Sequence, residues 1–113
     1  MIIKNTSQQT VLSSHARLCR SLWQKARGLM FSPQKDLVFV GSHEQKIPLH
    51  MFFVFYPIDV LYLNKEKKVV EIKENFLPFT FYNPQHKAHY VLELTAGTIK
   101  RTKTTVNDSL VFL

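Results

Sequence analysis

Cysteine and glycine are scarce in this chain of 113 residues, which contains one Cys and three Gly. A single cysteine, Cys19, excludes an internal disulfide framework and a four-cysteine zinc site. Three isolated glycines exclude a glycine-rich phosphate-binding loop. The five prolines and the 45% of hydrophobic residues are typical of a globular domain. At this length we expect one domain over residues 1–113.

The sequence also lacks a long hydrophobic run. The longest apolar stretch, residues 49–63, is interrupted by His50, Pro57 and Asp59, so we expect no membrane span. The first ten residues are too polar for a signal peptide. We therefore expect a cytoplasmic protein, and a lone cysteine is compatible with a reducing compartment.

Acidic residues are absent from the first 35 positions, whereas the net charge of the chain is +7. This segment holds six basic residues: Lys4, Arg17, Arg20, Lys25, Arg27 and Lys35. The ordinary interpretation is a solvated face, and the alternative is a basic face for an anionic partner. We do not expect nucleic acid as that partner, because the aromatic residues do not interleave with the charges and no zinc-finger or RNA-recognition pattern occurs.

Short runs of β-branched, aromatic and alternating apolar residues predict a chain of short strands. The expected strands cover residues 2–3, 11–12, 37–40, two segments of 50–64 separated at Pro57, 68–75, 88–94 and 109–113. Apolar spacing predicts a helix over residues 16–27, and a second short helix is expected within 95–102. The predicted fold is α+β and mostly β: a compact single domain of mainly antiparallel strands, sandwich or barrel-like, with one or two short helices.

Three segments carry a resemblance to a known family. They are RGLMF at residues 27–31, HMFFVFYPIDVLYL at residues 50–63 and YVLELTAGT at residues 90–98. In this order and spacing they are similar to the domain-of-unknown-function family 192, an uncharacterised protein family. The similarity extends from about residue 16 to residue 111.

The resemblance implies a compact β-rich domain and supplies no activity or cofactor. The chain departs from the family pattern at Thr95, where a proline is usual, and at Lys103 and Asn107, where glycines are usual. Asn tolerates a left-handed backbone, but Lys does so less readily. We therefore expect the turn around Lys103 to differ from that of the family.

Asp59 is the most informative polar residue, because it lies between Ile58 and Val60 in an apolar strand. A buried carboxylate without partners would be very costly. The structural interpretation is that Asp59 caps backbone amides freed at Pro57. The functional interpretation is a general base or a carboxylate that anchors a ligand.

Two histidines, His50 and His89, lie in or next to predicted strands. If these strands are neighbours, the imidazoles together with Asp59 or Glu93 would suit a metal ion. No metal-binding spacing demands this arrangement, so we predict no metal and no cofactor.

Glu93 and Thr98 are two further candidates. Alternation places Glu93 on one face with Val91, where it is either an outward residue or the partner of Arg27 or Lys25. Thr98 lies at the start of the second predicted helix, where either an anion-binding end or ordinary N-capping is expected.

The leading hypothesis is a small non-catalytic binding module for a small or anionic ligand. Its candidate ligand-binding residues are His50, Phe53, Asp59, Arg27 and Thr98. One alternative is a hydrolase-like enzyme that uses Asp59 and a histidine. Another is an adaptor that binds protein or nucleic acid through the basic N-terminal face. We expect a monomer or a weak dimer.

Overall fold

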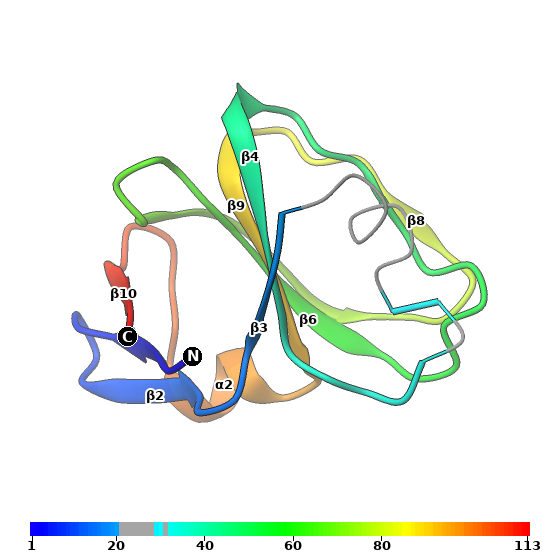
Figure 1. Cartoon of the computed structure of the whole chain (residues 1–113), viewed down its shortest axis with the longest axis horizontal. Helices are drawn as coiled ribbons and strands as arrows, with labels where there is room; N and C mark the ends of the chain where they lie inside the picture. The colour runs from blue at the N-terminus through cyan, green and yellow to red at the C-terminus, as the bar shows by residue number, and fades with distance from the viewer. Residues whose placement is uncertain (21–28, 31) are drawn as a thin grey trace.

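The computed structural model describes residues 1–20, 29–30 and 32–113, which form a mostly β structure (Figure 1). A five-stranded sheet has the order β3-β4-β9-β6-β7, a three-stranded sheet the order β10-β1-β2, and β5 pairs with β8. The strand pairs are antiparallel except for β3 with β4. The bounds are β1 Ile3–Asn5, β2 Thr10–Ser13, β3 Arg17–Cys19, β4 Leu37–Gln45, β5 Leu49–His50, β6 Ile58–Leu63, β7 Val69–Phe76, β8 Phe81–Tyr82, β9 Ala88–Thr95, α2 Thr98–Thr102 and β10 Leu110–Phe112.

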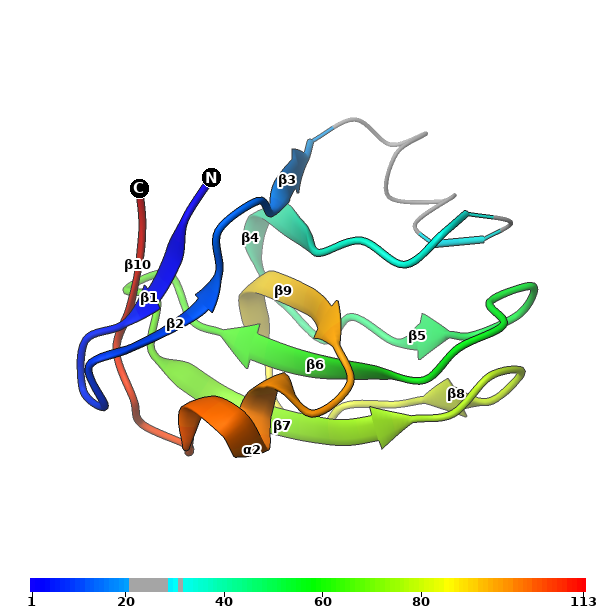
Figure 2. The same cartoon turned by 90° about the horizontal axis from the view of Figure 1, so that it is seen from below.

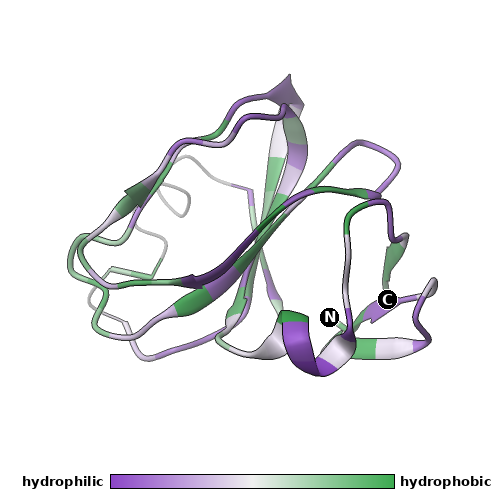
Figure 3. Cartoon of the chain, turned by 180° about the vertical axis from the view of Figure 1, so that it is seen from behind, coloured by the Kyte–Doolittle hydropathy of each residue, from purple (hydrophilic) through white to green (hydrophobic). Residues whose placement is uncertain are grey.

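The five-stranded sheet is covered on both faces. Figures 1 and 2 show the three-stranded sheet, which we call the small sheet, and α2 at one end of the molecule. The β5–β8 pair lies at the other end. Strand β6 is buried at every position, and β9 is buried from Val91 to Leu94. Figure 3 shows apolar residues along these strands and hydrophilic ones at the β6–β7 turn. The two faces of one sheet therefore contribute to two separate apolar clusters.

The predicted fold class is confirmed, but three local predictions are wrong. Residues 17–19 form strand β3 and not the start of a helix, because parallel pairing with β4 places Cys19 beside Phe39 in the core. The rest of that predicted helix, residues 21–28, lies outside the described residues. Strand β4 continues past Gly41 to Gln45, and residues 51–57 form turns between β5 and β6.

Strand β7 does not follow the simple alternation that would place Glu71 in water. Its pairing with β6 shifts between Tyr62 and Leu63: Leu63 pairs with Val69, but Tyr62 pairs with Glu71. The extra residue, Val70, forms a β-bulge, and a bulge redirects the side chains that follow it. Glu71 is consequently buried beneath the β8 segment.

Both positions that replace the family's usual glycines have a left-handed backbone. The φ angle is 58° at Lys103 and 78° at Asn107. Lys103 ends α2: its amide donates to the Lys100 carbonyl, and the Thr104 amide donates to the Ile99 carbonyl. This pair of bonds is the Schellman motif that commonly closes a helix, usually with glycine at the left-handed position. No helix among the described residues has the length and apolar content needed to span a membrane.

The Asp59 carboxylate joins three elements. Its Oδ1 accepts the Asn75 amide at 2.9 Å, near the end of β7. Its Oδ2 accepts the Gly97 and Ile99 amides, each at 3.0 Å, at the start of α2. Asp59 does cap backbone amides, but they come from β7 and α2 and not from the break at Pro57. The negative charge also complements the positive end of the helix.

We predict that Asp59→Ala lowers the free energy of unfolding by roughly 3–5 kcal/mol, because three amides lose a charged acceptor in a buried site. Urea denaturation at pH 7 measures this loss. The matched control is Glu66→Ala, an exposed acidic residue in the β6–β7 turn, which should change stability by less than about 0.5 kcal/mol. Equal effects of the two substitutions would refute the anchoring role of Asp59.

Candidate functional site

An apolar cavity of about 280 Å³ lies against one face of the five-stranded sheet, which we call the central sheet. Strands β4 and β9 contribute Phe39 and Val91, and the segment around β5 contributes Ile47, Met51 and Val54. Polar atoms enter it from few side chains: among the described lining residues these are Gln45, His50 and Glu93. A mainly apolar cavity with a few polar groups is the usual form of a small-molecule site.

Glu93 belongs to the central strand β9 and is only 8% exposed. It pairs across the sheet with Leu37 of β4 and Val60 of β6. Its side chain lines the cavity together with that of Val91, as alternation along the strand predicted. Among the residues that the structure describes, none donates a hydrogen bond to its carboxyl group. This carboxyl therefore lies in apolar surroundings.

Burial raises the pKa of Glu93 from 4.5 to about 7. Burial, followed by the nearby Glu93 carboxylate, also raises the pKa of the Cys19 thiol and of the Tyr56 hydroxyl. At neutral pH Glu93 is therefore close to its midpoint, and it can either accept or donate a proton. Such a carboxyl in a cavity is a candidate functional group.

The other buried acidic residues differ from Glu93 because their carboxylates have hydrogen-bond donors. Asp36 accepts the Thr95 amide at 3.1 Å, and Asp108 accepts the Asn5 side-chain amide at 2.9 Å. Burial alone would raise the pKa of Asp108, but bonds from Asn5 and Thr105 outweigh it and the pKa is lowered. These carboxylates, like Asp59, hold the fold together.

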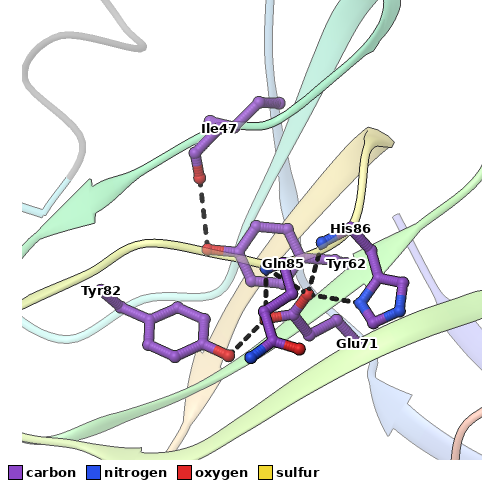
Figure 4. Close-up of polar contacts among 6 residues, drawn as sticks. All are labelled: Ile47, Tyr62, Glu71, Tyr82, Gln85 and His86. Carbon is purple, nitrogen blue, oxygen red and sulfur yellow. Dashed lines mark hydrogen bonds and ion pairs between the residues drawn. The ribbon is translucent and has the colours of Figure 1, made fainter.

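Glu71 is also extensively hydrogen-bonded (Figure 4). It accepts the Tyr82 hydroxyl, the Gln85 amide at 2.9 Å, the His86 amide at 2.9 Å and the His86 ring Nδ1 at 2.8 Å. Burial would raise the pKa of Glu71, but the bonds from Tyr82 and His86 lower it below its ordinary value. The bond to Glu71 in turn raises the pKa of Tyr82 to about 12.

This network holds one wall of the cavity in place. Tyr82 lies on β8, where it pairs with Leu49 of the wall. The Tyr62 hydroxyl donates to the Ile47 carbonyl at 3.3 Å, a second attachment of the same wall that Figure 4 shows beside Glu71. The Tyr56 hydroxyl donates to the Ser32 carbonyl at 3.1 Å. The cavity is therefore bounded by fixed backbone.

Of the predicted site residues, the four that the structure describes do not line a common cavity. His50 lines the cavity, and its Nδ1 accepts the Phe52 amide at 3.2 Å. Phe53 is half-exposed on the loop that follows β5. Among the described residues, Asp59 is not part of the cavity lining and forms no hydrogen bond to a residue that is. Thr98 is buried in the first turn of α2, and Arg27 lies outside the described residues.

The anion-binding interpretation of the α2 start fails for a physical reason: the Gly97 and Ile99 amides already bind the Asp59 carboxylate. The side-chain N-cap expected from Thr98 is also absent, because Gly97 occupies the cap position without a side-chain bond. A second, more open depression of about 460 Å³ next to α2 is lined by Asp36 and Arg101, which are bonded to other protein groups.

No group of three His, Cys, Asp or Glu side chains suited to a metal ion occurs among the described residues. His50 belongs to the β5–β8 pair and His89 to β9 of the central sheet, so the two imidazoles are on different sheets. Glu93 was a secondary candidate in the sequence, and its apolar neighbours Leu92 and Leu94 were the signal that it could be buried. The ion pair of Glu93 with Arg27 or Lys25 stays a prediction, because both cations lie outside the described residues.

The DUF192 family, described as "Uncharacterized ACR", matches residues 2–112. The chain belongs to this family. A UPF0127 protein of Pyrococcus horikoshii is 30% identical over 112 residues, which cover 96% of each chain. A UPF0127 protein of Pyrococcus furiosus is 31% identical over 109 residues, 94% of this chain and 93% of the other.

Two solved structures share the fold of this DUF192 domain. One, from Sinorhizobium meliloti 1021 and described as a candidate transcription regulator, has a TM-score of 0.86 at 24% identity and covers 97% of this chain and 89% of its own. The other, a protein of unknown function from Novosphingobium aromaticivorans, has a TM-score of 0.85 at 20% identity and covers 98% and 82%. At these identities the likeness establishes the fold alone.

The raised pKa of Glu93 predicts that its contribution to stability falls as pH rises. Between pH 4.5 and about 7 the folded chain retains a proton that the unfolded chain has released. The free energy of unfolding therefore falls by about 3 kcal/mol as pH rises through that window. Glu93→Gln removes this penalty. Urea denaturation between pH 4 and 8 should show the variant gaining stability relative to the wild type as pH increases.

Glu71→Gln is the control of opposite sign. In the wild type, the lowered pKa of Glu71 contributes stability above pH 4.5, and this stability is lost as pH falls through the pKa of the folded chain. The Glu71→Gln variant should therefore be less stable than the wild type at pH 7 and approach it in acid. A stability difference for Glu93→Gln that does not change with pH would contradict the raised pKa of that buried carboxyl.

Proposed function

We propose that this DUF192 domain is a small-molecule binding module whose cavity holds the apolar part of a ligand and whose Glu93 binds the ligand's single basic or hydrogen-bonding group. The observation that carries the proposal is the buried Glu93 carboxyl, which lines an apolar cavity without a donor among the described residues. A ligand that supplies that donor would satisfy the carboxyl and displace water from apolar walls.

A basic group is the best match for this site. The described lining contains one carboxyl and one imidazole, and none of its residues is Lys or Arg. An ammonium group beside Glu93 would favour the carboxylate and lower its pKa, whereas an anion would meet a like charge. A neutral hydroxyl or amide could instead bond to the protonated carboxyl. The composition suggested an anionic ligand, but these surroundings favour a basic or neutral one.

The hydrolase-like alternative has less support from the geometry. It relies on Asp59, and the two carboxylate oxygens of Asp59 accept three backbone amides. A general base needs a free lone pair within reach of the reacting proton. The adaptor alternative remains a prediction: Arg17 is exposed on β3, but Lys25 and Arg27 lie outside the described residues.

Three probes with the same chain length test the proposed ligand class: n-hexylamine, n-hexanol and hexanoate. We expect n-hexylamine to bind most tightly at pH 7 and hexanoate most weakly, as measured by NMR titration of the resonances of Val54 and Val91. The isosteric variant Glu93→Gln should weaken hexylamine binding at least tenfold. Binding of hexanol should change less than threefold.

Glu66→Gln is the matched control, because it removes an exposed acidic charge that is not part of the cavity lining and should leave all three affinities unchanged. Circular dichroism confirms that each variant is folded. If hexylamine bound equally well to the wild type and to Glu93→Gln, or if no probe shifted the cavity resonances, the proposed function would be wrong.

A further inference from the structure

Six large apolar side chains are exposed together at one end of the molecule. They come from the loop between β5 and β6, from the segment that joins β7 to β8 and from β8 itself: Phe52, Phe53, Phe55, Leu77, Phe79 and Phe81. We name this set the aromatic tip. Phe55 is 65% exposed and Phe81 is 68% exposed. Figure 2 shows both loops at the end opposite α2 and the small sheet.

The rings of the aromatic tip form two contacting groups, one of Phe52 with Phe81 and one of Phe53 and Phe55 with Phe79. The rings of Phe52 and Phe81 are 6.3 Å apart, and the Phe79 ring lies 6.1 Å from Phe53 and 5.4 Å from Phe55. Backbone bonds hold the two loops together: the Met51 amide donates to the Thr80 carbonyl, and the Phe79 amide donates to the Met51 carbonyl. The rings are therefore presented by a defined backbone.

Two of these residues occupy a backbone conformation that large side chains rarely adopt. The φ angle is 59° at Phe53 and 60° at Phe79. A left-handed backbone at a bulky residue costs free energy and persists only where the surroundings enforce it. Neither residue lies in the buried core.

The neighbouring side chains of the same loop have the opposite orientation. Met51 and Val54 are buried and line the cavity, whereas Phe52 and Phe55 face outward. The aromatic tip is thus separate from the cavity, and an inference about it does not depend on Glu93.

Charge is absent from the aromatic tip but abundant elsewhere. Residues 51–57 and 76–82 contain no Asp, Glu, Lys or Arg, and no acidic residue occurs between residues 45 and 58 or between residues 75 and 92. The whole chain carries a net charge of +7. An uncharged apolar protrusion on a basic protein matches the two layers of an anionic lipid surface, with hydrocarbon below and negative headgroups above.

We propose that the aromatic tip docks this domain reversibly on an anionic lipid surface. The phenylalanine rings and Leu77 enter the boundary between headgroups and acyl chains, and the positive charge of the domain is attracted to the headgroups. A lipid surface fits better than a protein partner because the exposed tip side chains include no Tyr, Trp or Arg, the residues that anchor protein interfaces through both area and hydrogen bonds.

Vesicle co-sedimentation tests the proposal with the full chain. We expect binding to vesicles of 70% phosphatidylcholine and 30% phosphatidylglycerol, and at least tenfold weaker binding to pure phosphatidylcholine. Because the attraction is screened by salt, binding should also weaken between 0.05 M and 0.5 M NaCl. Equal binding to the neutral vesicles would overturn the choice of an anionic surface.

The double substitution Phe55→Ser/Phe81→Ser removes the two most exposed rings without touching a left-handed position. It should reduce vesicle binding at least tenfold. The matched control is Val11→Ser/Val106→Ser, which removes two exposed apolar side chains outside the aromatic tip and should leave binding unchanged. Equal loss in both double variants, or no loss in either, would refute the role of the tip.

A tryptophan at the tip reports insertion directly. In a Trp23→Phe background, which removes the native tryptophan, the fluorescence of Phe55→Trp should shift to the blue on phosphatidylglycerol-containing vesicles, whereas that of Val106→Trp should not. Sedimentation velocity without lipid tests the competing occupant, a second copy of the chain. Self-association that the Phe55→Ser/Phe81→Ser variant abolishes, with no fluorescence shift on vesicles, would overturn the lipid proposal in favour of a dimer.

Discussion

Burial of both faces of strands β6 and β9 is the constraint on which the rest of the structure depends. A carboxylate inside such a sheet is costly unless donors surround it. Asp59 meets this condition with amides from β7 and α2, and Glu71, buried on the adjacent β7, meets it with Tyr82 and the His86 turn. Glu93 has no donor among the described residues, and it lies in the cavity. The presence or absence of donors separates the anchoring carboxylates from the candidate site.

The segments around β5 and β8 cover the cavity face of the five-stranded sheet, and they have an inner and an outer surface. Their inner side chains, including Met51 and Val54, close the cavity, and tyrosine hydroxyls fix the backbone behind them. Their outer side chains form the aromatic tip. The cavity and the aromatic tip therefore lie on opposite surfaces of the same segments.

Much of the fold follows from local patterns, whereas the site depends on distant contacts. Alternation correctly placed Glu93 beside Val91, and short apolar runs identified most strands. Strand β3 could not be distinguished from a helix, because its pairing with β4 is parallel and non-local. The bulge at Val70 places Glu71 on the opposite face from the one that alternation along β7 alone would give. The partners of Asp59 lie up to 40 residues away along the chain, so no local pattern identifies them.

The pKa of Glu93 tests the central claim most directly. A ¹³C NMR titration of its side-chain carboxyl carbon, assigned by comparison with Glu93→Gln, should give a midpoint close to 7, well above the ordinary value of 4.5. That result would establish a buried carboxyl that no cation neutralises. A midpoint below 4.5 would contradict the account, because it would mean that a cation such as Arg27 or Lys25 already pairs with Glu93.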